Sequence, residues 1–132
     1  MKTVWIVFFL SLLMAEAETP SFSKAFVYYT PFQFETYEAL TPKNIKEKAK
    51  YKIEVSDTNK VSVLVDLTSK GEKTSSFDEK RVRLLVVWGE GKQQTIVDAD
   101  GNVFDGETRR SLGAQNSEKL KNLLSELIKN AP

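Results

Sequence analysis

The sequence contains no histidine and no cysteine. Ser-His-Asp triads, Cys-His dyads and the usual zinc and copper sites all depend on at least one of these residues. The chemistry that remains open is a carboxylate pair, a Ser–Lys arrangement or a metal ion held by oxygen ligands. We therefore expect a protein that is not an enzyme and that binds no cofactor.

Long hydrophobic runs are also absent, apart from one near the start of the chain. There, Lys2 precedes an almost unbroken apolar run over residues 4–14, and the small-x-small sequence Ala15-Glu16-Ala17 follows it. These are the three parts of a secretory signal peptide. A membrane-spanning helix needs about 20 apolar residues, so this run is too short to serve as a membrane anchor. We expect residues 1–17 to be cleaved and the remaining chain to be exported.

The absence of cysteine also bears on the compartment. The chain has no residue for lipid attachment or for a disulfide, and it has no Asn-x-Ser/Thr glycosylation site. Small exported domains often rely on disulfides, so this one must be stabilised by packing and hydrogen bonds. Together these absences favour a bacterial periplasm or exterior. The net charge of +1 argues against a nucleic-acid partner.

Residues 18–132 are predicted to form a single α+β domain, with residues 18–25 as a flexible start. We expect an antiparallel β-meander of about five to seven strands, a short helix in the N-terminal half and a C-terminal amphipathic helix packed on the sheet. The expected strands have β-branched and aromatic residues, most of them in alternation. They cover residues 26–29, a segment after Pro31, and residues 51–55, 61–67, 82–88, 93–97 and 103–104.

Three of these segments carry more specific expectations. The turn-rich sequence between residues 51–55 and 61–67 predicts an antiparallel hairpin. Residues 82–88 are apolar on both faces after Arg83, which is typical of a strand in the centre of a sheet. Residues 68–80 are polar and are expected to form an exposed loop, anchored to the body by Phe77.

Two helices are predicted from their start signals and spacing. Thr41 can cap a helix that Pro42 begins and that would run to about Lys50. A second helix would be capped by Asn116 or Ser117. Its large apolar residues recur with helical spacing and would cover one face of the sheet. They are Leu120, Leu123, Leu124, Leu127 and Ile128.

Aromatic residues gather between positions 22 and 37. They are Phe22, Phe26, Tyr28, Tyr29, Phe32, Phe34 and Tyr37. Strands favour aromatic residues for packing, so one interpretation is that all of them belong to the core. However, the rings lie on both sides of the backbone, and a single covering helix leaves one face of a sheet open. Exposed rings would form a binding patch, for which the candidates are Tyr28, Tyr29, Phe32, Phe34 and Tyr37.

The acidic stretch near the end of the chain resembles the start of a calcium-binding loop. Asp98, Asp100 and Asn102 have the spacing of the first three ligands, and Asp105 follows. Valine and arginine stand where such a loop requires its glycine and its glutamate. A hairpin turn is therefore the expected structure, because aspartate, asparagine and glycine are common turn residues.

Two further charged groups are interpreted as ordinary surface. Glycoside hydrolysis would need a carboxylate pair at a set separation, which the spacing of Glu35, Glu38 and Asp66 does not indicate. The densest basic cluster contains Glu47 as well, so we expect a solvated face and not an anion site. It comprises Lys43, Lys46, Lys48, Lys50 and Lys52.

Three hypotheses for function follow. The first is an exported, non-enzymatic binding or accessory domain that contacts an envelope or extracellular protein through the aromatic segment and the loop at residues 68–80. The second is a carrier that holds a small apolar ligand between the sheet and the C-terminal helix. The third is a small hydrolase that uses carboxylates or a Ser–Lys pair. The sequence favours the first, and it leaves the oligomeric state open.

Overall fold

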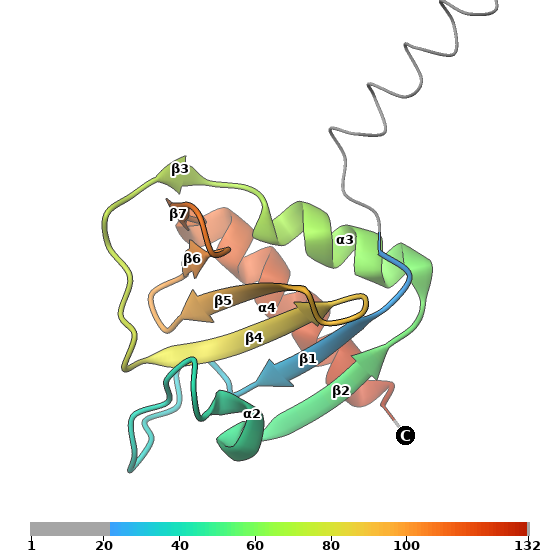
Figure 1. Cartoon of the computed structure of the whole chain (residues 1–132), viewed down its shortest axis with the longest axis horizontal. Helices are drawn as coiled ribbons and strands as arrows, with labels where there is room; N and C mark the ends of the chain where they lie inside the picture. Colours follow the sequence, from blue (N-terminus) through green and yellow to red (C-terminus); the bar gives the residue numbers. More distant parts are fainter. Residues whose placement is uncertain (1–21, 132) are drawn as a thin grey trace, which may run out of the picture.

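The computed structural model describes residues 22–131, which form a single α+β domain built on one antiparallel sheet of seven strands (Figure 1). The predicted signal peptide, residues 1–17, lies outside the described residues. The strands are β1 (Ala25–Tyr29), β2 (Tyr51–Val55), β3 (Glu72–Lys73), β4 (Val82–Trp88), β5 (Gln93–Asp98), β6 (Asn102–Phe104) and β7 (Arg109–Ser111). The helices are α2 (Ile45–Lys48), α3 (Thr58–Thr68) and α4 (Gly113–Lys129).

The strand order across the sheet is β2-β1-β4-β5-β6-β7-β3. Strand β4 lies inside the sheet between β1 and β5, and every one of its residues is buried. The interior position predicted for residues 82–88 is therefore confirmed. The two ends of the sheet differ, because β2 has five residues whereas β3 has only two.

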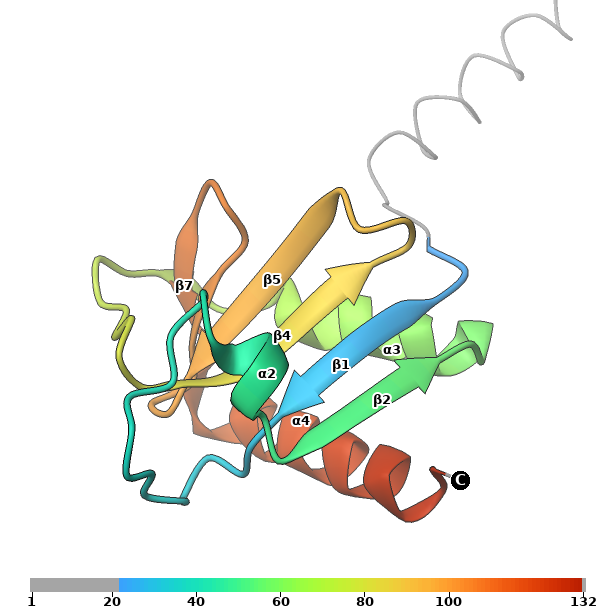
Figure 2. The ribbon, with the colours of Figure 1, turned by 60° about the horizontal axis from the view of Figure 1, so that its bottom comes forward.

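Helices α3 and α4 cover one face of the sheet, and α2 lies on the other face (Figure 2). Leu64 of α3 and Leu124 of α4 are fully buried against Val27 and Val86 of the sheet. The second face has a smaller core, in which Ile45 of α2 packs near Leu85. Phe77 packs in this second core beside Phe104. It therefore anchors the loop at residues 68–80 to the body of the domain, as predicted.

The prediction of a strand at residues 61–67 was wrong: this segment lies within helix α3 (Thr58–Thr68). The Asp57 carboxylate caps the helix by accepting hydrogen bonds from the N–H groups of Asn59 (2.9 Å) and Lys60 (3.4 Å). Helical spacing puts Val61, Leu64 and Leu67 on the buried side. Strand β2 consequently pairs with β1 and makes no hairpin with this segment. Packing against the sheet overrides the β-propensity of the valines.

The other helices are present with different bounds. Helix α2 is confined to Ile45–Lys48, and the turn before it is closed by reciprocal hydrogen bonds between Thr41 and Asn44. Helix α4 has the predicted apolar stripe but begins at Gly113 after buried Leu112, so the predicted cap at Asn116 or Ser117 was wrong. The segment after Pro31 forms no strand, and β3 and β7 were not predicted. No helix within residues 22–131 has the length and apolar character needed to cross a membrane.

Paired substitutions in α3 test the helix directly. Leu64 is fully buried and Val63 is 47% exposed, whereas an alternating strand would have placed Val63 inside and Leu64 outside. We expect Leu64→Ala to lower the free energy of unfolding by about 3 kcal/mol and Val63→Ala to change it by less than about 0.5 kcal/mol. Urea unfolding followed by circular dichroism measures both values. The reverse ranking would contradict the helical register.

Candidate binding surface on the loop between β1 and α2

The structure separates the five candidate aromatic residues into buried and exposed groups. Tyr29 and Phe32 are buried in the main core, with exposed fractions of 4% and 6%. Tyr28 is half-buried against the smaller core on the opposite face. Phe34 is 38% exposed, and Tyr37 is fully exposed. The exposed rings therefore belong to the loop that follows β1 and not to the strand itself.

This loop, residues 31–40, is held at its base by the core. Phe32 packs beside Tyr29, with ring centroids 5.7 Å apart. The guanidinium of Arg83 reaches out of β4 and donates a hydrogen bond to the Phe34 carbonyl oxygen (3.0 Å). At the far end of the loop, the Val82 N–H donates to the Leu40 carbonyl oxygen (2.9 Å). Both ends of the loop are thus fixed to β4.

Arg83 is an unusual residue for an interior strand. Burial lowers the pKa of its guanidinium, and the nearby charge of Arg81 adds to that effect. Its Nε has no hydrogen-bond partner, while its two terminal nitrogens donate to the carbonyl oxygens of Val82 and Phe34. A buried cation is costly unless its donors are satisfied. The contact with the loop therefore supplies one of the two acceptors of Arg83 and fixes the backbone beside Phe34.

One lysine lies against an exposed ring of the loop, and a second is paired with a carboxylate. The Lys50 Nζ lies 4.5 Å from the centroid of the Phe34 ring, which is close enough for a cation–π interaction. Lys48 forms an ion pair with Glu38, and this hydrogen bond raises the pKa of the Lys48 ammonium group. Among the described residues, no aromatic or cation–π contact involves Tyr37. The outer surface of the loop therefore presents one free phenol and one partly covered ring beside positive charge.

A groove of about 740 Å³ lies elsewhere, between α3, β5 and the turn that joins β6 to β7. It is open and is lined mainly by polar and charged residues. Its best-placed donors are already used within the chain. The Trp88 Nε1 donates to the Thr95 hydroxyl (2.9 Å), and the Arg110 guanidinium donates to Asp105 (3.0 Å) and to the Thr68 carbonyl oxygen (2.7 Å). The buried leucines of α4 fill the space between that helix and the centre of the sheet. An open groove of about 370 Å³ remains beside them, lined by polar residues of α4 and by Tyr29 and Tyr51 of the sheet.

The four residues that resemble a calcium loop serve the turns instead. Asp98 is fully buried, and its two oxygens accept hydrogen bonds from the N–H groups of Asp78, Asp100 and Asn102. Asp105 accepts from the backbone of the turn that follows it and from Arg110. Among residues 22–131 there is no group of three or more acidic side chains placed to hold a metal ion.

The other charged residues singled out from the sequence do not converge. Glu38 of the loop is paired with Lys48 of α2. Asp66 of α3 is paired with Lys70, which follows that helix (3.7 Å). Glu35 is exposed on the loop, away from α3. The lysines at positions 43–52 are spread over the turn before α2, α2 itself and β2, with Glu47 among them. These residues therefore form exposed, mixed-charge surface.

The turn at Asp105 gives a pH-dependent prediction. Burial by itself would raise the pKa of Asp105, but the N–H groups of Thr108 and Glu107 and the side chain of Arg110 outweigh it, and the pKa falls from 3.8 to about 2. A lowered pKa in the folded state stabilises the fold above pH 3.8, and this contribution is lost as the pH falls through about 2.

We therefore expect Asp105→Asn to lower the free energy of unfolding by about 1 kcal/mol at pH 6, a value reduced for the partial exposure of the carboxylate. The difference from the wild type should shrink between pH 4 and pH 2. Urea unfolding across this pH range measures it, with Glu90→Gln in the exposed β4–β5 turn as the control. A difference that stayed constant with pH would show that the carboxylate charge is not responsible.

Comparison with known proteins gives no assignment. No protein-family model matches the chain, no curated protein matches it, and no solved structure matches it. The functional argument therefore depends on the contacts and the exposed surface of this chain alone.

Proposed function

We propose that this protein is an exported, non-enzymatic binding domain that acts through contact with another protein. The observation that carries the proposal is the full exposure of Tyr37 on a loop whose two ends are fixed to β4. Tyrosine supplies a large contact area with few rotatable bonds, and it is enriched among the residues that dominate binding energies. A loop already held in place also loses little conformational entropy on binding.

The surroundings of Tyr37 fit a protein partner better than a small ligand. Phe34 and Tyr37 are exposed on the loop, whereas small molecules are usually enclosed in concave pockets. The loop at residues 68–80 returns to the sheet beside the same site, because Arg81 and Leu40 form a short bridge. A partner that covers the aromatic loop could therefore also contact this second, polar loop. Lys50 beside the Phe34 ring favours a partner with an acidic group at the edge of its contact surface.

Export is the second part of the proposal, and its support lies in the sequence of residues 1–17. A positive start, a short apolar run and a small-x-small site occur there in the required order. We expect the exported chain to begin at Glu18. Mass spectrometry of the protein recovered from a secreting host would detect this terminus, and recovery of an uncleaved chain in the cytoplasm would contradict export.

Removal of the two exposed rings tests the binding loop. The chain from residue 18 onward, immobilised, should retain a specific protein from envelope or extracellular extract. Tyr37→Ala and Phe34→Ala should each weaken this binding by about tenfold or more, because aromatic hot-spot residues typically contribute at least that much. Binding constants for the purified partner, measured by titration calorimetry, provide the comparison.

A matched control keeps this test specific. Glu90→Ala changes an exposed residue in the turn between β4 and β5. This turn follows the end of β4 that is opposite to the end contacted by the loop. It should leave binding unchanged. Tyr37→Ala should also leave the unfolding midpoint unchanged, because the ring is fully exposed. Equal binding by wild type and Tyr37→Ala would show that the loop is not the contact surface.

A further inference from the structure

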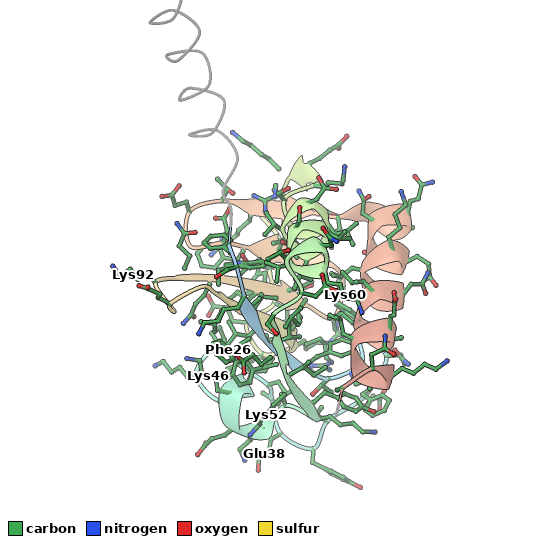
Figure 3. The ribbon with its side chains drawn as sticks, turned by 90° about the vertical axis from the view of Figure 1, so that its right-hand side faces the viewer. Phe26, Glu38, Lys46, Lys52, Lys60 and Lys92 are labelled. Carbon is green, nitrogen blue, oxygen red and sulfur yellow. The ribbon has the colours of Figure 1, made fainter. Side chains whose placement is uncertain are left out.

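Strand β2 forms one end of the sheet and has no neighbour on its outer side among residues 22–131. Figure 3 views the molecule from the side towards which β2 points, with Lys52 labelled between α2 and α4. An edge strand carries unpaired N–H and C=O groups that can pair with another strand. The question is which of its residues direct these groups outward.

The hydrogen bonds of β1 show which residues of β2 direct their backbone groups outward. The Thr30 N–H donates to the Arg83 carbonyl oxygen (2.8 Å), and the Gly89 N–H donates to the Lys24 carbonyl oxygen (2.9 Å). The even-numbered backbone groups along β1 therefore face β4, and the odd-numbered ones face β2. In the β1–β2 register, the odd-numbered partners in β2 are Tyr51, Ile53 and Val55. The backbone groups of Lys52 and Glu54 consequently point to the open edge.

The side chains of these two residues share one face of the sheet and are exposed. They carry opposite charges and are two positions apart. On the other face, Tyr51 and Ile53 are only half-buried beside the main core. The open edge of β2 therefore combines free backbone groups, one positive and one negative side chain, and apolar surface that the chain covers only in part.

We infer that β2 pairs with β2 of a second copy of this chain, antiparallel and centred on Ile53. In this register Lys52 lies opposite Glu54 of the second copy, and Glu54 lies opposite its Lys52. These residues are the ones with outward backbone groups, so both form hydrogen-bonded pairs. Two opposite-charge pairs then lie across the interface, and the half-buried Ile53 side chains meet at the two-fold axis.

The charge pattern selects this partner and this register. A shift of the pairing by two residues would place Lys52 opposite Lys52, or Glu54 opposite Glu54, and like charges directly opposite each other destabilise a strand pair. The opposite end of the sheet is a two-residue strand, too short to offer a comparable edge. Pairing between two β2 strands also closes the assembly at two copies, because it uses the same edge in both.

Charge exchange at the edge tests the inference. Sedimentation equilibrium of the chain from residue 18 onward should show a monomer–dimer equilibrium. Lys52→Glu and Glu54→Lys should each weaken the dimer by about tenfold, since each replaces two opposite-charge pairs with two like-charge pairs. The double variant, K52E with E54K, should restore the dimer to within about threefold of wild type. Lys46→Glu, an exposed lysine on α2, is the control and should leave dimerisation unchanged.

Amide hydrogen exchange supplies a readout that needs no substitution. The Lys52 and Glu54 amides should exchange quickly in dilute solution and more slowly as concentration rises. The Ile53 amide should stay protected throughout, because it pairs with β1 in the monomer. A chain that is monomeric at its highest soluble concentration would overturn the inference. Equal weakening of the dimer by Lys52→Glu and by Lys46→Glu would also overturn it.

Discussion

Strand β4 is buried along its whole length, and the rest of the domain is arranged around the need to cover both of its faces. On one face, α3 and α4 supply Leu64, Leu120 and Leu124, all with no exposed surface. On the other face the described part of the chain supplies the single turn of α2 with Ile45, Ala49 directly after it, and the loop residue Phe77. Without disulfides, this two-sided burial is the main source of stability.

The burial of β4 also explains the one exposed aromatic loop. Arg83 lies within this strand, and its side chain needs hydrogen-bond acceptors because it has left water. It finds one in the backbone of the loop at residues 31–40, beside Phe34. A requirement of the core thereby fixes the position of surface residues that take no part in the core. The proposed contact through Tyr37 depends on this arrangement.

Short connections along the chain account both for the single helical turn on the second face and for the open edge at β2. Helix α2 ends at Lys48, two residues before the chain turns into β2, so it lies over the sheet and does not reach around its edge. The chain then runs directly from β2 to α3 on the opposite face. Neither helix shields the outer backbone groups of β2. The loop proposed to bind a partner and the free edge adjoin at Lys50, whose Nζ lies 4.5 Å from the Phe34 ring centroid and 5.6 Å from that of Tyr51. Different substitutions test each surface.

The amino-acid sequence was sufficient to predict the elements that have a single consistent pattern: the apolar strand at residues 82–88, the leucine stripe of the last helix, and the turns at Asp98 and Asp105. It could not determine residues 58–68, because two patterns overlap there: Val61, Val63, Val65 and Leu67 alternate as in a strand, whereas Val61, Leu64 and Val65 have the i, i+3, i+4 spacing of a helix. Nor could it separate buried Tyr29 and Phe32 from exposed Tyr37, since adjacent aromatic residues have the same propensities. The tertiary structure decided both points, because burial depends on which neighbouring surface is available to each side chain: the sheet covers one side of α3, whereas no part of the described chain covers the tip of the loop.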